Sequence, residues 1–392
     1  MSKISATIVA DSLSPQGDRL TSVLVTFPRI ILSEINTHRM LSKNTSSSRA
    51  IPFNKMVESI QNDPFIPIAW QKEHKGMQGT EYLVDRAADL RNQQWLIARD
   101  NAVEMATALS LPVNNFGGDL VSEPATKQLA NRLLEPFMWT TMLITGSKEG
   151  WNNFFNLRCP SYLHEGSNTI YKSKKDYQNR EFEDFQIPFD NDTATNIDWL
   201  QINKGQAEIH MMALAESIYD AMNESTPKQL QAGEWHIPFE DNIHLDNKGT
   251  NINDEAYGMT LRMFFEAMPS LSKIKGAPVD VKISTAMAAR TSYTVVGDEK
   301  EVDYKKMIEL HDRLLSQNPP HSSPLEHCAR VMSDDEYVSF IKGQVDTVES
   351  ERFDDTFVAY NKSWNDESSS GWCNNLKGFI SYRYMIDNKW KS

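Results

Sequence analysis

The stretch at residues 36–49 limits what this chain can form more than any other segment does. It reads NTHRMLSKNTSSSR and follows an apolar, strand-like segment. Because Ser and Asn side chains compete for backbone hydrogen bonds, the polar run at 42–48 is not expected to continue as a helix. We therefore predict a short helix that carries His38 and Arg39 to its C-terminal end, followed by a hydroxyl-rich loop.

Two interpretations of this stretch are open from its residues alone. His38 and Arg39 fit a solvated helix end, where cations complement the helix dipole. The residues behind them favour anion binding instead, because a run of hydroxyls and amides without a carboxylate, closed by Arg49, suits phosphate. On the second interpretation the stretch is one wall of a nucleotide site.

The composition excludes several classes of protein. The formal net charge is −13 over 392 residues, which argues against binding a nucleic acid polymer. An anionic small molecule would need a local basic pocket. The three cysteines have no metal-ligand spacing, and their odd number favours a reducing compartment. With no apolar run of about 20 residues and no signal peptide pattern, we expect a cytoplasmic protein without a metal or a membrane partner.

Hydrophobic patterns predict both strands and helices. β-branched residues at 3–10 and 19–27, around the turn sequence SPQGD, predict a hairpin. Further strands are predicted at 137–144 and 279–283, although a short apolar run at 137–144 also fits the start of a buried helix. Helices are predicted at 93–110, from 122 onward with Ala125, Leu129 and Leu133 on one face, and at 203–222, 260–267 and 303–316. No G-x-G-x-x-G sequence or P-loop is present.

Several other motifs have plain structural interpretations. The sequence from Ser323 to Glu326 fits a helix capping box with Pro at the first helical position. Arg132 and Arg158 each end an apolar segment, where arginine commonly extends its charge to solvent. Cys159 lacks a neighbouring histidine, so a buried thiol is a better interpretation than a nucleophile.

Taken together, five separate blocks resemble the flavin-dependent thymidylate synthases. The family signature is Arg-His-Arg, two residues, Ser, one residue, Asn-Glu, one residue, Ser, one residue, Arg. Residues 37–49 keep its spacing, but Thr37 replaces the first Arg and Thr45 replaces the Glu. Glu34 stands where many members have Gln. The other four blocks are NRLLEP at 131–136, NFFNLR at 153–158, AARTSY at 288–293 and HSSPLEH at 321–327.

The order of these blocks differs from that of the family. The blocks at 288–293 and 321–327 precede the His-Arg signature in the family and follow it here. We infer a circular permutation, which proteins tolerate when their termini lie close together at the surface. The resemblance implies an α+β fold with a mixed sheet and long packed helices. It also implies one catalytic domain over 1–392, built from 1–158, 203–222 and 279–392, with insertions at about 160–200 and 224–256.

The resemblance also implies a role for individual residues. The contacts to FAD would come from His38, Arg39, Met40, Asn153, Ser292, His321, Ser323 and Glu326. The substrate dUMP would lie against Ser46, Ser47, Arg49, Arg132 and Arg158. Among these, Ser47 and Arg158 would act on the pyrimidine, with Ser47 orienting or polarising the ring without forming a covalent bond.

The implied reaction is the reductive methylation of dUMP to dTMP. In the family, NADPH reduces FAD, methylenetetrahydrofolate supplies the carbon, and the protein positions and polarises the reactants. Family members are homotetramers, which we carry over as an expectation. Because Thr37 and Thr45 together remove two charges, hydroxymethylation of dUMP or dCMP is an alternative. A non-catalytic nucleotide-binding subunit is a second alternative.

Overall fold

The computed structural model describes residues 3–76, 79–164, 168–179, 194–244, 277–292, 303–318, 320–340, 348–353, 356–361 and 370–388. Within these residues the fold mixes α-helices with a central sheet, as expected for an α+β protein. The helix predicted at 260–267 lies outside the described residues. No helix in the described ranges is both long enough and apolar enough to cross a membrane.

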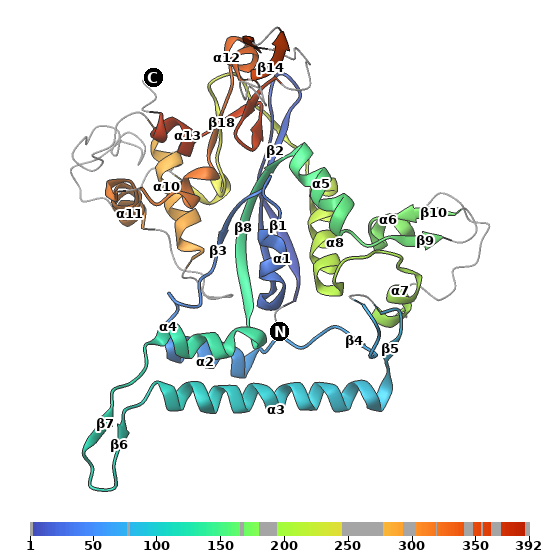
Figure 1. Ribbon diagram of the computed structural model, residues 1–392, viewed down its shortest axis with the longest axis vertical. Helices are drawn as coiled ribbons and strands as arrows, with labels where there is room; N and C mark the ends of the chain where they lie inside the picture. Colours follow the sequence, from blue (N-terminus) through green and yellow to red (C-terminus); the bar gives the residue numbers. More distant parts are fainter. Residues whose placement is uncertain are drawn as a thin grey trace.

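A five-stranded sheet forms the centre of the molecule (Figure 1). The strands, in spatial order, are β11 (Lys228–Gln229), β1 (Ser5–Leu13), β2 (Arg19–Pro28), β8 (Trp139–Ser147) and β3 (Ser42–Thr45). The predicted hairpin is confirmed, because β1 and β2 pair antiparallel across a turn with Gly17 at positive φ. The strand predicted at 137–144 is also confirmed as β8, and β11 runs parallel to β1.

Helices cover both faces of this sheet. On one face, α5 (Lys148–Arg158) and α8 (Ile209–Glu224) pack on alternate strand residues such as Val23 and Ile144. The opposite face, which includes Leu143, packs against α10 (Val279–Arg290), and α11 (Tyr304–Ser316) lies behind α10. The predicted helix at 303–316 is confirmed, and that at 203–222 is confirmed with later bounds.

The strand predicted at 279–283 is wrong, because these residues begin helix α10. Val279, Ile283 and Ala286 recur at helical spacing and pack against α11. A short apolar run fits a buried strand or a buried helix equally well, and here the longer periodicity continues to Arg290.

A helical layer lies across one end of the sheet (Figure 1). It contains α2 (Phe53–Asn62), α3 (Asp85–Leu109), α4 (Lys127–Ala130) and the 3-10 helix η2 (Asn131–Phe137). A two-stranded hairpin, β6 (Val113–Asn114) and β7 (Leu120–Ser122), follows α3.

The helix predicted from residue 122 onward is wrong in its start and its face. Ser122 belongs to β7, and α4 begins at Lys127. The predicted apolar positions Leu129 and Leu133 are exposed, whereas Ala130 and Leu134, one residue later, are buried. The spacing was therefore right, but the neighbouring residues occupy the core.

The remaining elements are short. Before the helical layer come η1 (Arg29–Ile31) and α1 (Leu32–Asn36), and between α2 and α3 come β4 (Trp70–Gln71) and β5 (Tyr82–Leu83). Part of the predicted 160–200 insertion forms β9 (Tyr162–His164), β10 (Thr169–Tyr171), α6 (Lys174–Gln178) and α7 (Asn196–Ile202) around an aromatic cluster. From residue 224 onward the chain adds β12 (Trp235–His236) and η3 (Glu240–Asn242).

The C-terminal part packs beside the central sheet through a three-stranded sheet of order β12, β13 (Ala329–Val331) and β18 (Phe379–Ser381). The 3-10 helix η5 (Ser323–Glu326) precedes β13, and α13 (Tyr382–Asp387) follows β18. The other elements are α12 (Asp334–Ser339), β14 (Val348–Phe353), β15 (Thr356–Asn361), β16 (Trp372–Cys373) and β17 (Leu376–Lys377).

Candidate functional site

The hydroxyl-rich run does not begin as the predicted loop. Residues Ser42–Thr45 form β3, an edge strand that pairs antiparallel with β8. Ser42 and Asn44 are buried, and the residues between and after them are less so. Polar side chains are usually unfavourable on the buried face of a strand, but those of β3 form hydrogen bonds with distant segments. The predicted short helix is confirmed as α1, which ends shortly before His38.

Asn44 is the centre of a buried group of hydrogen bonds. Its amide nitrogen donates to the backbone oxygen of Ala288 and, over 2.8 Å, to the hydroxyl of Thr291. Its amide oxygen accepts from the hydroxyls of Ser323 at 2.8 Å and Ser292 at 3.3 Å. We call these five residues the Asn44 cluster. It joins three of the sequence blocks, although Asn44 and Ser323 lie 279 positions apart.

The serines after β3 lie beside this cluster. The backbone N–H of Ser47 donates to the oxygen of Ser292 at 2.7 Å, and that of Ser46 donates to Thr141 at 2.8 Å. These two backbone N–H groups are therefore occupied, so Ser47 would have to contact a ligand through its side chain. Arg49, at the end of the run, is exposed.

His38 and Arg158 form a second group. The Nε of Arg158 donates to Nε2 of His38 at 2.9 Å, and Nη1 donates to Glu34 at 3.2 Å. The ring of His38 also meets Phe154 edge-on, with centroids 4.9 Å apart. Burial, reinforced by the charges of Arg158 and Lys43, lowers the pKa of His38 to about 4. His38 is therefore a neutral acceptor at neutral pH, with its proton on Nδ1.

Lys43 and Glu326 bring opposite charges next to these groups. Lys43 extends back to donate to the backbone oxygen of His38. Burial lowers the pKa of Lys43 to about 8, and the charge of Glu326 partly offsets this effect. Burial raises the pKa of Glu326, opposed by its hydrogen bond with Ser42. Lys43 thus supplies a titratable cation that the sequence comparison did not assign.

The predicted capping box at 323–326 is wrong. These residues form a single 3-10 turn without a side-chain cap, and the Ser323 hydroxyl bonds to Asn44 instead. The hydroxyl of a capping serine must bond to the backbone of its own helix, whereas the hydroxyl of Ser323 donates to the side-chain amide oxygen of the distant Asn44.

Arg132 lies apart from both groups. Its side chain is 54% exposed and approaches Glu135 at 3.9 Å. Arg29 donates to the same carboxylate at 3.4 Å and to the backbone oxygen of Ser46 at 2.6 Å. Arg29 and Arg132 line a pocket of about 460 Å³, and Ser48 also donates to Glu135. Arg132 is therefore connected to the serine run through Glu135.

Other predicted cofactor residues are not drawn together. Asn153, Arg39 and His321 are exposed, and Met40 is partly buried. Within the described ranges, no hydrogen bond joins Asn153 or His321 to the Asn44 cluster. The sequence comparison missed Asn44 as a structural centre, although its buried place between Ser42 and Ser46 follows the alternation of a strand.

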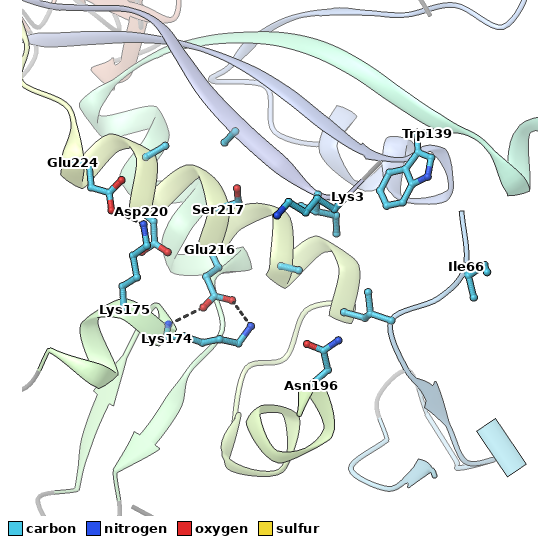
Figure 2. A pocket seen from close by; sticks show the side chains of 15 residues that line it. Lys3, Ile66, Trp139, Lys174, Lys175, Asn196, Glu216, Ser217, Asp220 and Glu224 are labelled. Carbon is cyan, nitrogen blue, oxygen red and sulfur yellow. Dashed lines mark hydrogen bonds and ion pairs between the residues drawn. The ribbon is translucent and has the colours of Figure 1, made fainter. Parts of the chain in front are cut away.

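A second pocket, of about 780 Å³, lies on the face of the sheet covered by α8 (Figure 2). Figure 2 shows Lys174 reaching Glu216, whose carboxylate accepts the Lys174 backbone N–H at 2.7 Å. The Tyr162 hydroxyl donates to Glu216 at 3.0 Å, and Lys175 pairs with Glu224. Two of its acidic residues, Glu216 and Glu224, are thus paired with lysines, and no predicted site residue is among the described residues that line it.

A second buried polar network crosses the sheet. His236 contacts the hydroxyls of Ser12 and Ser22 at 2.8 Å each, Ser22 contacts Thr145 at 2.5 Å, and Thr145 contacts Nδ1 of His327 at 2.8 Å. We call these five residues the histidine chain. Burial lowers the pKa of both histidines to about 3, so both are neutral at neutral pH.

The described residues contain neither an accessible thiol nucleophile nor a group of side chains that could hold a metal ion. The three thiols are buried, and burial raises the pKa of Cys328 to about 11, that of Cys373 to about 12 and that of Cys159 further. A thiolate is therefore scarce at neutral pH. No group of three His, Cys, Asp or Glu side chains within the described part of the chain could hold a metal ion.

The sequence matches no protein-family model and no curated protein. Part of the fold is similar to two structures of the UMP/dUMP methylase PolB from Streptomyces cacaoi. With 5-Br dUMP bound, the identity is 14% and the TM-score 0.30, over 40% of this chain and 79% of that chain. With 5-Br UMP bound, the identity is 16% and the TM-score 0.29, over 41% of this chain and 78% of that chain. TM-scores this low do not assign a fold or a function to this chain.

Proposed function

We propose that this protein is a flavin-dependent enzyme that reductively methylates dUMP to dTMP. The observation that carries the proposal is the Asn44 cluster. It joins the hydroxyl-rich block to the blocks at 288–293 and 321–327, which no local pattern relates. Blocks that resemble parts of one site are expected to meet if the site exists.

The predicted cofactor residues suit, by their chemistry, a dinucleotide with two phosphates and a polar ring. Arg39 and His321 are exposed, so they can hold phosphate oxygens, and Arg is well matched to that geometry. Ser292 and Ser323, which bond to Asn44, and Glu326, which bonds to Ser42, offer further polar groups. When bound, FAD would supply the hydride, with NADPH as reductant and methylenetetrahydrofolate as carbon donor. FAD would also contact His38, Met40 and Asn153.

The other predicted residues would hold the nucleotide substrate. Arg49 and the side chain of Ser47 would bind the phosphate, with Ser46 and Arg132 beside them. Arg158 uses Nε for His38 and Nη1 for Glu34, which leaves Nη2 to donate to a pyrimidine carbonyl. Such a hydrogen bond polarises the ring toward attack, so the protein needs no nucleophile of its own.

One observation favours a second candidate, hydroxymethylation of dCMP. Glu34 holds Arg158 through Oε2, so its other carboxylate oxygen can accept a hydrogen bond. An ionised carboxylate only accepts, and therefore fits the amino group of cytosine rather than the O4 carbonyl of uracil. Burial and the charge of Glu208 raise the pKa of Glu34, opposed by Arg158, and a protonated Glu34 would donate to uracil instead.

Product analysis separates these candidates. Purified protein is incubated with FAD, NADPH, methylenetetrahydrofolate and either dUMP or dCMP, and the nucleotides are identified by mass spectrometry. Formation of dTMP from dUMP supports the main proposal, and a hydroxymethylated nucleotide supports the second. If the protein binds dUMP but forms no product from either nucleotide, it is a non-catalytic subunit and both proposals are wrong. Arg158→Ala serves as the control that removes the ring contact.

A further inference from the structure

Arg29 and Glu135 form an ion pair beside the serine run at 46–48, and the family resemblance implies no role for either residue. Arg29 follows strand β2, and Glu135 belongs to the 3-10 helix η2. Nη2 of Arg29 donates to Oε1 of Glu135 at 3.4 Å, and the two side chains are only 12% and 23% exposed. Because a largely buried ion pair adds little net stability, its place beside a candidate phosphate site needs another explanation.

The ion pair holds the serine run on both sides of Ser47. Nη1 of Arg29 donates to the backbone oxygen of Ser46 at 2.6 Å. The hydroxyl of Ser48 donates to Oε1 of Glu135 at 2.5 Å. The residue whose side chain is expected to contact the phosphate therefore lies between two residues that the ion pair fixes.

Asn131 holds the end of the same segment. Its side-chain amide is fully buried and donates to the backbone oxygens of Ser48 at 2.7 Å and Ile51 at 3.0 Å. The backbone oxygen of Ser46 is also bonded, so three carbonyl groups of the segment have side-chain donors. Carbonyl oxygens repel an anion, and a loop that binds phosphate must direct them elsewhere. The hydroxyl of Ser47 is thereby left to meet the phosphate.

Glu135 also lies between two arginines. Its Oε1 is 3.4 Å from Nη2 of Arg29 and 3.9 Å from Nη1 of Arg132, whose side chain is 54% exposed. One carboxylate can balance only one guanidinium. Because Arg29 is the more buried and makes the shorter contact, Glu135 serves chiefly as its counter-ion. Without Arg29 the carboxylate would pair with Arg132 and weaken its attraction for an anion.

We propose that Arg29 and Glu135 are positioning residues of the nucleotide site. The pair holds the serine run in the shape that receives a phosphate, and it keeps the charge of Arg132 available for that phosphate. The inference rests on the proposed function, because it takes the ligand to be a pyrimidine nucleoside monophosphate such as dUMP. Its effect concerns the phosphate, so it should appear as selectivity for dUMP over deoxyuridine, which has the same base and sugar.

Equilibrium binding tests the proposal without requiring turnover. Isothermal titration calorimetry on the protein supplied with FAD gives the dissociation constant of deoxyuridine divided by that of dUMP. Arg29→Gln removes the charge and is expected to lower this ratio about tenfold. Arg29→Lys keeps a cation beside Glu135 and should keep the ratio within about threefold of the wild-type value. A residue that only stabilised the fold would not change this ratio.

Two further variants separate the charge from the packing. Adding Glu135→Gln to Arg29→Gln removes the carboxylate that would capture Arg132, so the ratio should return to within about threefold of the wild-type value. Ser48→Ala removes the other donor to Oε1 of Glu135 and should lower the ratio about threefold. Because this change is small, it also serves as the test if Arg29→Gln does not fold.

Arg19→Gln is the matched control. Arg19 is a partly buried arginine at the other end of β2, and its Nη2 donates to Asp11 at 2.7 Å and to the backbone oxygen of Met222 at 2.8 Å. The control loses the same kind of ion pair and carbonyl contact, but it should leave the ratio unchanged. Circular dichroism verifies that each variant is folded.

The outcomes distinguish this inference from the proposed reaction. An unchanged ratio in Arg29→Gln, or in Ser48→Ala if the former does not fold, would overturn the inference. An equal fall in Arg19→Gln, or a double variant no better than Arg29→Gln, would do the same. A wild type without preference for dUMP would overturn both the inference and the proposed phosphate site. The expected ratios in a protein that forms no product would support the inference and contradict only the reaction.

Discussion

The Asn44 cluster and the histidine chain are built from similar groups, yet they suit different tasks. Both include hydroxyl groups, both involve polar side chains on strands of the central sheet, and both reach the C-terminal part of the chain, at Ser323 and His327. The histidine chain is buried throughout, at Ser12, Ser22, Thr145 and both histidines. In the Asn44 cluster, by contrast, Ser292 and Ser323 are only partly buried.

This difference shows that solvent access decides whether a polar network can only stabilise the fold or can also take part in binding. A buried network can only bond to itself, so its hydroxyls and imidazoles fix the register of β1, β2 and β8 against the C-terminal segment. A network at the edge of the sheet can bond to itself and still present neighbouring side chains to a ligand. Polar composition alone does not distinguish the two.

The largest effect is expected from His236→Leu in the histidine chain. The substitution leaves the buried hydroxyls of Ser12 and Ser22 without their shared partner and is expected to lower the free energy of unfolding by about 2–4 kcal/mol. Denaturant unfolding measures the change. Flavin affinity of the folded variant should stay at the wild-type value. A loss of affinity without a loss of stability would contradict the structural role of the chain.

Asn44→Ala is expected to lower the free energy of unfolding less than His236→Leu does, and to weaken flavin binding more. Removing the amide leaves the hydroxyls of Ser323 and Thr291 without this hydrogen-bonding partner, which is expected to lower the free energy of unfolding by about 1–3 kcal/mol. Because the three blocks then lose their shared anchor, FAD affinity should fall at least tenfold, about 1.4 kcal/mol. Fluorescence titration of FAD measures the loss. Thr45→Ala, one residue along β3, is the control and should bind FAD normally.

The smallest effect concerns the pH dependence of flavin binding. The pKa of Lys43 is lowered to about 8, so the side chain loses its positive charge as the pH rises through that value. If this charge attracts the phosphates of FAD, affinity should fall above pH 8 by up to tenfold per pH unit. In Lys43→Arg the cation does not titrate in this range, so the loss should disappear. An identical pH profile in the variant would rule out this role.

Local patterns predicted the elements that their own residues determine. The hairpin of β1 and β2 and helix α11 follow from alternation, turn residues and a cap at Asp303. The edge strand β3 was missed because its polar residues resemble a loop, and only distant partners make their burial favourable. Asn44 depends on groups more than 240 positions away, which no pattern within 36–49 could indicate.

The sequence was a better guide to which residues belong to the candidate site than to which residues they contact. The block at 37–49 drew attention to His38 and the serines, and the structure connects His38 to Arg158, Ser47 to Ser292, and Asn44 of the same block to Ser323. No local pattern indicated that Arg158 would pair with Glu34, because charge pairing across 124 positions depends on the packing of α1 beside α5.

The most direct test of the central claim is the re-oxidation of reduced flavin. The purified protein is loaded with FAD, reduced under anaerobic conditions, and mixed with methylenetetrahydrofolate with and without dUMP while the flavin absorbance is followed. We expect rapid re-oxidation only when dUMP is present, and we expect this re-oxidation to be lost in Asn44→Ala. A protein that binds no flavin, or whose reduced flavin is indifferent to dUMP and to dCMP, would contradict it.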